Sequence, residues 1–348
     1  FFGVGGDELE KSGMELCYHL KDFSSFGFSE VVGKIPFYFR ALKHLENEVK
    51  RRQCKVAILI DFQDFNLKLA KRLRKNGVKV LYYVAPQAWA WKAGRAQVLE
   101  ETVHTLFSIL PFEKKWFSDR GVKKIVSVPH PLSLRYKDEL LKISEKPHEL
   151  LKQKLKLLIL PGSRNDEVRF LMPQFEQTIV NLRKLIKTPI EVGLVRSSNV
   201  KEELWKMYGS QIDRVWQNED LSKALSWAHM SLAASGTVTL AAGLFQVPTV
   251  VAYQGSLLNQ YIFETFVRYD KPISLTNLIL GARVFPEFIQ ERASAFNMTG
   301  ALLELMTNKH EYDRVKSELS RLPELLAGED QPAHLMLKAF DEKNEAFT

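Results

Sequence analysis

The chain has 348 residues, of which 45% are hydrophobic and 26% charged, a balance typical of folded globular proteins. This length exceeds one ordinary α/β domain and suits two. No apolar stretch reaches the roughly 18 residues that a membrane-spanning helix needs, so none is predicted. The two cysteines, Cys17 and Cys54, form no CxxC motif or His/Cys cluster, which predicts no metal site and a reducing compartment.

The formal net charge of +8 is compatible with nucleic acid, anionic lipid or phosphorylated substrates as partners. No helix-turn-helix, RNA-recognition or zinc-finger pattern accompanies the basic residues, so we expect no nucleic-acid binding. The first residue, Phe1, is not Met and follows no signal-peptide pattern. We therefore expect no secretion signal and a natural N-terminus that lies upstream.

In the first half of the chain, continuous apolar runs alternate with helix patterns. Such runs are typical of strands buried on both faces, as in a parallel sheet. A helix is predicted over 66–76, with Gly77 at its C-terminal end. The predicted strands cover 56–60, 79–84, 105–110 and 124–128. This alternation predicts a doubly wound α/β domain.

A second series of the same kind follows the charged stretch 139–154, where we place the domain junction. Its helices are predicted over 168–187 and 237–245, and its strands over 155–160, 190–195, 230–234 and 249–253. A last amphipathic helix, 331–347, is expected to follow Asp330 as its N-cap and to pack across the domain boundary. The predicted domains are thus 1–148 and 149–328, with 329–348 as a C-terminal helix.

Ligands bind to open α/β sheets at the carboxyl ends of the strands, so residues just after each strand are the site candidates. Leu160-Pro-Gly-Ser-Arg164 combines a strand end, a glycine turn and the start of a helix. Free backbone N–H groups there, with the Arg164 guanidinium, predict an anion site. Ser235-Gly-Thr237 repeats this pattern, and the two turns together could hold a nucleotide diphosphate. An ordinary turn remains the alternative at both places.

In the first domain Asp61 ends the most apolar strand, and a carboxylate there suits a general base for a sugar hydroxyl. We expect Asp64 to cap the following helix instead. The loop 86–91 carries Trp89 and Trp91, which could line a sugar or acyl site or simply anchor the core. Arg95 lies one helical turn further on. His130 lies between two prolines, and no second histidine stands at the spacing that a pair of metal ligands would have.

The segment around Gly33 and Pro36 is unusually apolar and is flanked by Lys34 and Arg40. It could form a lipid-contacting patch with a cationic rim, or a buried junction between a loop and a helix. The residues of this candidate membrane contact are Val31, Val32, Ile35, Phe37 and Phe39.

Taken in order, these segments resemble lipid-A-disaccharide synthase. Residues 26–33 resemble the family's "MGxxEVxG" segment, and Ile60-Asp-Phe-Gln-Asp-Phe-Asn66 resembles its "IDxPDFN". The further segments that carry the resemblance are 1–6, 83–91, 110–113, 130–131, 160–164, 234–237, 274–277 and 286–290. The resemblance covers essentially the whole chain, but the chain starts one strand and one helix later than the family, so the family's N-terminal "GExSGD" loop is absent.

The resemblance implies a GT-B architecture, in which two Rossmann-like doubly wound domains face a central cleft. It implies an inverting glycosyltransferase without a cofactor, which joins UDP-2,3-diacylglucosamine to lipid X and releases UDP. The product is the β-1,6 lipid A disaccharide 1-phosphate of lipopolysaccharide biosynthesis. It further implies a peripheral protein on the cytoplasmic, anionic face of a Gram-negative inner membrane, and it leaves a homodimer open.

The resemblance also assigns roles to individual residues. Asp61 would be the catalytic base. The acceptor side of the cleft would be lined by Asn66, Gln87, Trp89, Trp91 and Arg95. The donor would be held by Gly162, Ser163, Arg164, Glu167, Ser235, Gly236, Thr237, Asn277, Glu287 and Gln290.

Three positions depart from the family pattern: Ala241 replaces a usual Glu, Gln63 a usual Pro, and Pro129 a usual Gly. A carboxylate at position 241 would bind the nucleotide ribose, so Ala241 puts donor affinity in question. Two alternatives therefore stay open. One is a diverged GT-B enzyme or epimerase with another nucleotide sugar, and the other is a non-catalytic relative that binds lipid or nucleotide.

Overall fold

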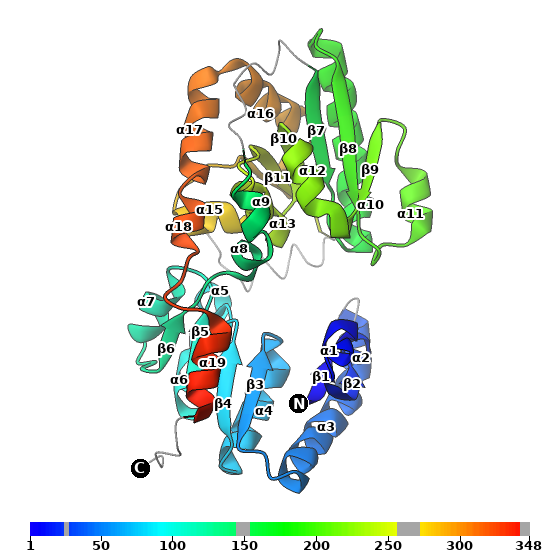
Figure 1. The fold of residues 1–348 in the computed structure, drawn as a ribbon. Coiled ribbons are helices and arrows are strands. Elements are labelled where there is room, and N and C mark those ends of the chain that lie inside the picture. The colour runs from blue at the N-terminus through cyan, green and yellow to red at the C-terminus, as the bar shows by residue number, and fades with distance from the viewer. Residues whose placement is uncertain (24–27, 144–153, 256–271, 342–348) are drawn as a thin grey trace. The chain divides into compact units, whose positions relative to one another are not determined.

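The computed structural model describes residues 1–23, 28–143, 154–255 and 272–341. The chain divides into two compact units (Figure 1). The N-terminal unit comprises residues 1–128 together with 329–348, and the C-terminal unit comprises residues 129–328. Both units are built on parallel sheets, so the predicted α/β class is confirmed.

The C-terminal unit contains a six-stranded parallel sheet with the order β12-β11-β10-β7-β8-β9. All residues of β10 and nearly all of β7 are buried, as their continuous apolar sequences predict. The order reverses between β7 and β10, which are hydrogen-bonded neighbours. The strands are β7 (Leu155–Leu160), β8 (Ile190–Arg196), β9 (Arg214–Gln217), β10 (Met230–Ala234), β11 (Thr249–Tyr253) and β12 (Glu287–Ile289).

Helices of the C-terminal unit pack on this sheet and on one another. Helix α12 contacts β7, β8 and β9, whereas α10 contacts β10, β11 and α16. The helices are α8 (Pro131–Arg135), α9 (Lys137–Leu140), α10 (Asn165–Leu185), α11 (Glu202–Met207), α12 (Leu221–Trp227), α13 (Thr237–Leu244), α15 (Leu275–Leu280), α16 (Ala295–Thr307), α17 (Lys309–Leu319) and α18 (Leu322–Leu325).

The N-terminal unit contains a four-stranded parallel sheet in the order β3-β4-β5-β6 and a two-stranded parallel sheet of β1 and β2. Strand β3 is an edge of the larger sheet, and its Ile60 side chain is 54% exposed. The strands are β1 (Phe2–Gly5), β2 (Glu15–His19), β3 (Val56–Ile60), β4 (Lys79–Tyr83), β5 (Thr105–Ser108) and β6 (Ile125–Ser127).

Helices of this unit bury apolar faces against the larger sheet. Leu69, Ala70 and Leu73 of α4, for example, belong to one core with Val80 and Tyr82 of β4. The helices are α1 (Asp7–Lys11), α2 (Leu20–Phe23), α3 (Phe28–Arg51), α4 (Gln63–Lys75), α5 (Ala88–Trp91), α6 (Arg95–Thr102), α7 (Glu113–Ser118) and α19 (Pro332–Asp341).

The boundary between the units falls earlier than the sequence predicts, at residue 128 rather than 148. Helix α8 packs within the C-terminal unit: Tyr136, the residue that follows α8, lies edge-on to Phe245 at 5.3 Å, and the His130 N–H donates to the Leu326 carbonyl. The last helix belongs to the N-terminal unit, where Leu335 of α19 packs with Leu81 and Phe107. The predicted boundary was too late because α8 and α9 directly follow β6 along the chain, although both helices belong to the C-terminal unit.

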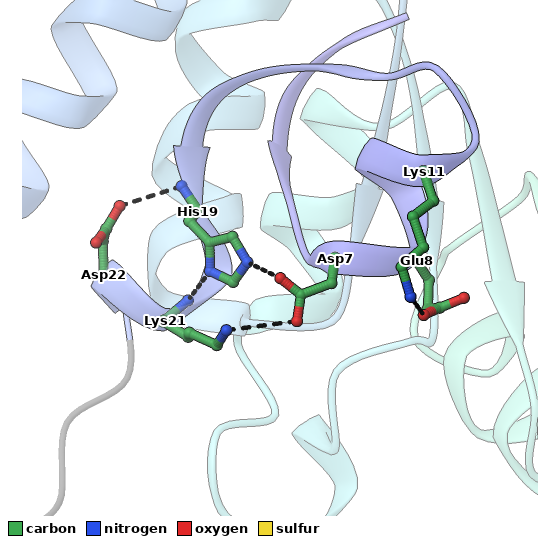
Figure 2. A network of polar contacts seen from close by, with 6 residues as sticks. All are labelled: Asp7, Glu8, Lys11, His19, Lys21 and Asp22. Atoms are coloured by element: carbon green, nitrogen blue, oxygen red, sulfur yellow. Dashed lines mark hydrogen bonds and ion pairs between the residues drawn. The ribbon is translucent and has the colours of Figure 1, made fainter.

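A polar network holds the carboxyl ends of β1 and β2 together (Figure 2). Asp7 Oδ1 lies 2.9 Å from His19 Nε2, and the Lys21 N–H donates to His19 Nδ1 at 3.0 Å. Since Nδ1 accepts a hydrogen bond, the proton of the neutral ring lies on Nε2 and is donated to Asp7. Hydrogen bonds from His19 and Lys21 lower the pKa of Asp7. This network was not predicted from the sequence.

Candidate functional site

The two small-residue turns predicted as an anion site lie side by side in the C-terminal unit. Leu160, the last residue of β7, is paired with Ala233 of β10, so the turns at 161–164 and 235–237 leave the same edge of the sheet. The strand order reverses between these two strands, and such reversal points are where open α/β sheets bind ligands.

The turn after β7 is held by a carboxylate. Glu167 Oε2 accepts hydrogen bonds from the Ser163 N–H at 2.8 Å and the Arg164 N–H at 3.2 Å, and Glu167 Oε1 accepts one from the Arg164 guanidinium at 2.8 Å. The sequence predicted that these N–H groups would be free for a ligand, and in this respect the prediction was wrong. Glu167, in the first turn of α10, satisfies them from within the chain.

A pocket of about 430 Å³ opens at these turns, a size that suits a small-molecule ligand. It brings together most of the predicted donor-site residues, namely Gly162, Ser163, Arg164, Glu167, Ser235, Gly236 and Thr237. The other lining residues are Leu132, Arg135, Tyr136, Leu160, Val195, Ser197, Asn199, Asn218, Leu221, Ala234, Val238 and Ala241.

Several of these lining residues were not singled out from the sequence. Ser197 and Asn199 follow β8, and Asn218 follows β9, so the rule that sites gather at carboxyl strand ends would have indicated them. Strand β9 itself was not predicted. Arg135 lines the pocket from α8, and no local sequence signal distinguishes it from other surface arginines.

The charges around the pocket favour an anionic ligand. Arg135 and Arg164 are exposed cations in its wall. Among the lining residues that the structure describes, Glu167 is the single acid, and its oxygens already accept hydrogen bonds from the 163–164 turn. Guanidinium groups beside small-residue turns suit phosphate oxygens. Ala241, by contrast, offers the pocket only a methyl group.

Asn277, Glu287 and Gln290 were predicted donor residues, but they are not among the residues that line this pocket. Asn277 is fully buried, and its amide bonds the Phe285 carbonyl, the Glu287 carboxylate and two backbone N–H groups. Glu287 accepts hydrogen bonds from the N–H groups of Ile273 and Ser274. The Ser235 hydroxyl donates to the Ile273 carbonyl, so these hydrogen bonds link the segment around Asn277 and Glu287 to the pocket turn at 235–237.

Gln290 has a positive φ of 54° and forms hydrogen bonds with the 254–255 segment. Its side-chain oxygen accepts the Gly255 N–H at 3.1 Å, and its carbonyl accepts a hydrogen bond from the Gln254 amide. These contacts tie the end of β12 to the end of β11. A role in contacting a donor remains a prediction for all three residues.

In the N-terminal unit the turn after β3 has an unusual backbone. Asp61 and Phe62 both adopt the left-handed conformation, with φ of 46° and 43°. For residues other than glycine this costs about 1–2 kcal/mol each. The Asp61 carbonyl accepts hydrogen bonds from the Tyr82 hydroxyl at 2.7 Å and the Asn66 amide at 2.8 Å. The Asp61 N–H donates to the Tyr83 carbonyl at 3.0 Å.

The Asp61 carboxylate itself is exposed, and no side chain in the described part of the chain donates a hydrogen bond to it. A fixed backbone with an uncommitted carboxylate is the arrangement that a general base needs. Strained backbone of this kind concentrates at functional sites. The predicted acceptor residue Asn66 acts here through the backbone, because its amide holds the Ile60 and Asp61 carbonyls.

Asp64 does not cap α4 as predicted, because the helix begins at Gln63 and Phe62 occupies the N-cap position. The buried guanidinium of Arg95 instead donates to the Asp64 carboxylate at 2.5 Å and to the Gln63 side chain. Arg95 thus ties the start of α6 to the first turn of α4, immediately after Asp61.

The tryptophan loop lies at the end of β4, the neighbour of β3. Gln87 is exposed, and the half-buried indole of Trp89 donates its Nε1–H to Glu113 at 3.1 Å. Trp89 also packs edge-on against Phe112, with ring centroids 5.1 Å apart. The side chain of Trp91 lies outside the described residues.

The candidate membrane contact lies on α3, in a helix and not in a loop. Ile35 and Phe39 are exposed, whereas Phe37 is half-buried and packs against Phe23 at 5.1 Å. The side chains of Val31 and Val32 lie outside the described residues. One face of the helix is thus apolar and exposed, and the other joins an aromatic core; contact of the exposed face with lipid stays a prediction.

Among the described residues, no group of three or more His, Cys, Asp or Glu side chains is arranged to hold a metal ion. In that same part of the chain, no helix has the length and apolar character required to cross a membrane.

Comparison with known proteins decides the family. The family model for lipid-A-disaccharide synthetase matches residues 1–336. The chain belongs to the lipid-A-disaccharide synthase family. It is accordingly a glycosyltransferase with a role in lipid A disaccharide synthesis.

Curated members of the family align over most of the chain. The lipid-A-disaccharide synthase of Myxococcus xanthus is 34% identical and is matched over 83% of this chain and 76% of its own length. That of Chromohalobacter salexigens is 32% identical, over 87% of this chain and 79% of its own.

Solved structures of other enzymes share the fold at low sequence identity. A calicheamicin glycosyltransferase, CalG4, has a TM-score of 0.57 at 13% identity, with 97% of this chain and 89% of that chain covered. A UDP-GlcNAc 2-epimerase from Neisseria meningitidis, bound to UDP-GlcNAc, has a TM-score of 0.53 at 12% identity, with 97% and 99% covered. These likenesses identify the two-domain Rossmann-like GT-B fold.

Proposed function

We propose that this chain transfers the diacylglucosamine unit of UDP-2,3-diacylglucosamine to the 6-hydroxyl of lipid X, with inversion at the anomeric carbon. The products are the β-1,6 lipid A disaccharide 1-phosphate and UDP. The observation that carries the proposal is the cationic pocket at the reversal point of the C-terminal sheet, in a chain that belongs to this family.

The C-terminal unit supplies donor binding in this proposal. As the bond between the anomeric carbon and the diphosphate oxygen breaks, its electron pair stays with UDP and negative charge grows on the diphosphate. Arg164 and Arg135, with the Ser163 hydroxyl and the turn at 235–237, stabilise that charge. Groups that act on charge developing in the transition state raise the rate instead of only tightening ground-state binding.

The N-terminal unit supplies the base. Asp61 takes the proton from the acceptor 6-hydroxyl while that oxygen forms its bond to the anomeric carbon. The exposed carboxylate on a turn fixed by Tyr82 and Asn66 supports this role. A general base contributes about 10²- to 10⁴-fold to such reactions.

The exposed apolar face of α3 gives access to acyl chains in this proposal. Ile35 and Phe39 would enter the lipid interface, and the exposed Arg40 and Lys43 would meet anionic headgroups of the inner leaflet. The cationic side chain of Lys68 already lies 5.7 Å from the Phe39 ring centroid. We therefore propose a peripheral location at the cytoplasmic face of the inner membrane.

Ala241, which replaces the Glu of the family pattern, favours a second candidate function. In that case the chain either uses another nucleotide sugar or binds lipid or nucleotide without catalysing transfer. The decisive experiment mixes the protein with UDP-2,3-diacylglucosamine and radiolabelled lipid X in detergent. We expect a labelled disaccharide and stoichiometric UDP. UDP binding without product would overturn the proposed reaction in favour of the second candidate, and product with a different UDP-sugar would establish a changed donor.

A further inference from the structure

Glu113 is an almost completely buried carboxylate to which neither the family pattern nor the proposed reaction gives a role. It is 1% exposed, follows β5, and is the first residue of α7. Strands β3, β4 and β5 are consecutive neighbours in the sheet, so Glu113 lies at the same carboxyl edge as the Asp61 turn.

The carboxylate joins the loops that follow two neighbouring strands. Its Oε1 accepts the indole N–H of Trp89, in the loop after β4, at 3.1 Å. Its Oε2 accepts the backbone N–H of Leu110, in the loop after β5, at 3.2 Å, and the Glu113 N–H donates back to the Leu110 carbonyl at 3.1 Å. Glu113 therefore closes its own loop and holds Trp89 against it.

Burying a carboxylate costs more free energy than burying a neutral side chain that could form a purely structural link. Burial raises the pKa of Glu113 to about 7, although hydrogen bonds from Trp89, Leu110 and Ile109 oppose this rise. Desolvating a charged group costs free energy that only good hydrogen bonds offset. Hydrogen bonds to a charged acceptor are about twice as strong as neutral ones, so the ionised form of Glu113 holds the indole more firmly than an amide would.

The tryptophan loop is also held at its far end, next to Asp61. Arg95, which follows the loop, binds Gln63 and Asp64 in the first turn of α4. At its near end Val84 has a φ of 65°, a rare conformation for a β-branched residue. Two buried side chains therefore hold the loop and the residues that follow it: Glu113 binds Trp89, and Arg95 binds the first turn of α4.

We propose that Glu113 is a positioning residue for the acceptor: it fixes Trp89 and the loop 84–91 at the sheet edge that carries Asp61. This inference rests on the proposed function, since it assigns the loop to acceptor binding. Glu113 acts through Trp89, and the residues that line the donor pocket belong to the other unit.

The test compares Glu113→Gln, Trp89→Phe and the double variant with wild type. Glu113→Gln keeps the size of the side chain but removes the charge, and Trp89→Phe keeps a ring but removes the donor. We expect either single change to raise KM for lipid X about tenfold, with KM for the donor unchanged. The double variant should be no worse than the singles, because both changes act on the same contact between Glu113 and Trp89.

Glu100→Gln is the matched control. Glu100 also accepts a backbone N–H, that of Lys123 at 2.9 Å, but it is exposed and lies in α6 ahead of β5. Its kinetics should match wild type. Equal rises in both KM values for Glu113→Gln, or additive effects in the double variant, would overturn the positioning role.

Amide hydrogen exchange separates this inference from the proposed function. In Glu113→Gln, exchange should accelerate in residues 84–91 and remain unchanged in 160–167, compared with Glu100→Gln. If wild type yields no disaccharide, the proposed function fails while exchange still tests the link. Unchanged exchange in 84–91 overturns the proposal whatever the transfer assay gives.

Discussion

The carboxylate of Glu167 occupies the space where a side chain at residue 162 would stand. A Cβ built on Gly162 would lie 2.2 Å from Glu167 Oε2 and 2.8 Å from its Cβ, and Gly162 has a φ of 104°. The absence of a side chain at residue 162 therefore lets Glu167 close the turn that carries Ser163 and Arg164. The glycine is needed for the approach of Glu167 as well as for the backbone conformation.

Replacing this glycine should open the turn. For Gly162→Ala we expect a loss of at least about 1 kcal/mol in the unfolding free energy of the C-terminal unit and weaker UDP binding, measured by calorimetry. Gly300→Ala is the control, since a Cβ there meets nothing within 4 Å. UDP affinity that survives Gly162→Ala unchanged would separate the turn from donor binding.

Removing the base should abolish transfer and spare donor binding. Asp61→Asn keeps the shape of the side chain, so we expect kcat to fall by about 10²- to 10⁴-fold while the Kd for UDP stays constant. Asp119→Asn, at an exposed residue that pairs with Lys115 in the same unit, should retain full activity. Loss of UDP binding in Asp61→Asn would instead give Asp61 a structural role.

A carboxylate restored at position 241 should strengthen donor binding. The methyl group of Ala241 lines the pocket, and the single acid of the described lining, Glu167, is committed to the turn. In Ala241→Glu the new carboxylate can accept hydrogen bonds from the ribose hydroxyls, which we expect to raise UDP affinity roughly tenfold. The gain should vanish with 2′,3′-dideoxy-UDP. Weaker binding of both nucleotides would show that the pocket has no room for the larger side chain.

Two buried groups should give the two units opposite responses to acid. Burial raises the pKa of Glu113 in the N-terminal unit to about 7, above the 4.5 of a free carboxyl. Burial lowers the pKa of His130 in the C-terminal unit to about 4, below 6.5. Glu113 therefore contributes stability that is complete below pH 4.5 and lost as the pH rises to 7. His130 contributes stability that is complete above pH 6.5 and lost as the pH falls to 4.

The measurement is unfolding free energy against pH for wild type, Glu113→Gln and His130→Asn. The stability of wild type relative to Glu113→Gln should rise as the pH falls from 7 to 5, by about 1.4 kcal/mol for each unit of pKa shift that is titrated. The stability of wild type relative to His130→Asn should instead fall as the pH falls from 7 to 5. Asn suits this position because its oxygen can accept the Leu132 N–H as His130 Nδ1 does. Parallel curves for all three proteins would contradict both assignments.

Local sequence patterns were enough to predict the fold class and most of the strands. Residues 56–60, 155–160, 230–234 and 249–253 form strands with the predicted bounds. Residues 56–60 are equally apolar although β3 is a partly exposed edge strand. In the other three strands the continuous apolar run reflects burial on both faces, and such a signal is local. The glycine turns after β7 and β10 were found for the same reason, since a strand end, a glycine and a helix start are adjacent along the chain.

The contacts that the predicted residues make could not be predicted in this way, because they depend on the tertiary fold. Glu167 closes the turn that it was predicted to share with the donor, and Asn277 and Glu287 form hydrogen bonds with each other in the segment that the Ser235 hydroxyl links to the pocket turn. Arg135 reaches the pocket, and Glu113 reaches Trp89, from segments distant in sequence. Periodicity and turn chemistry report on neighbours along the chain, whereas a hydrogen bond between two loops depends on how the sheet brings its strand ends together.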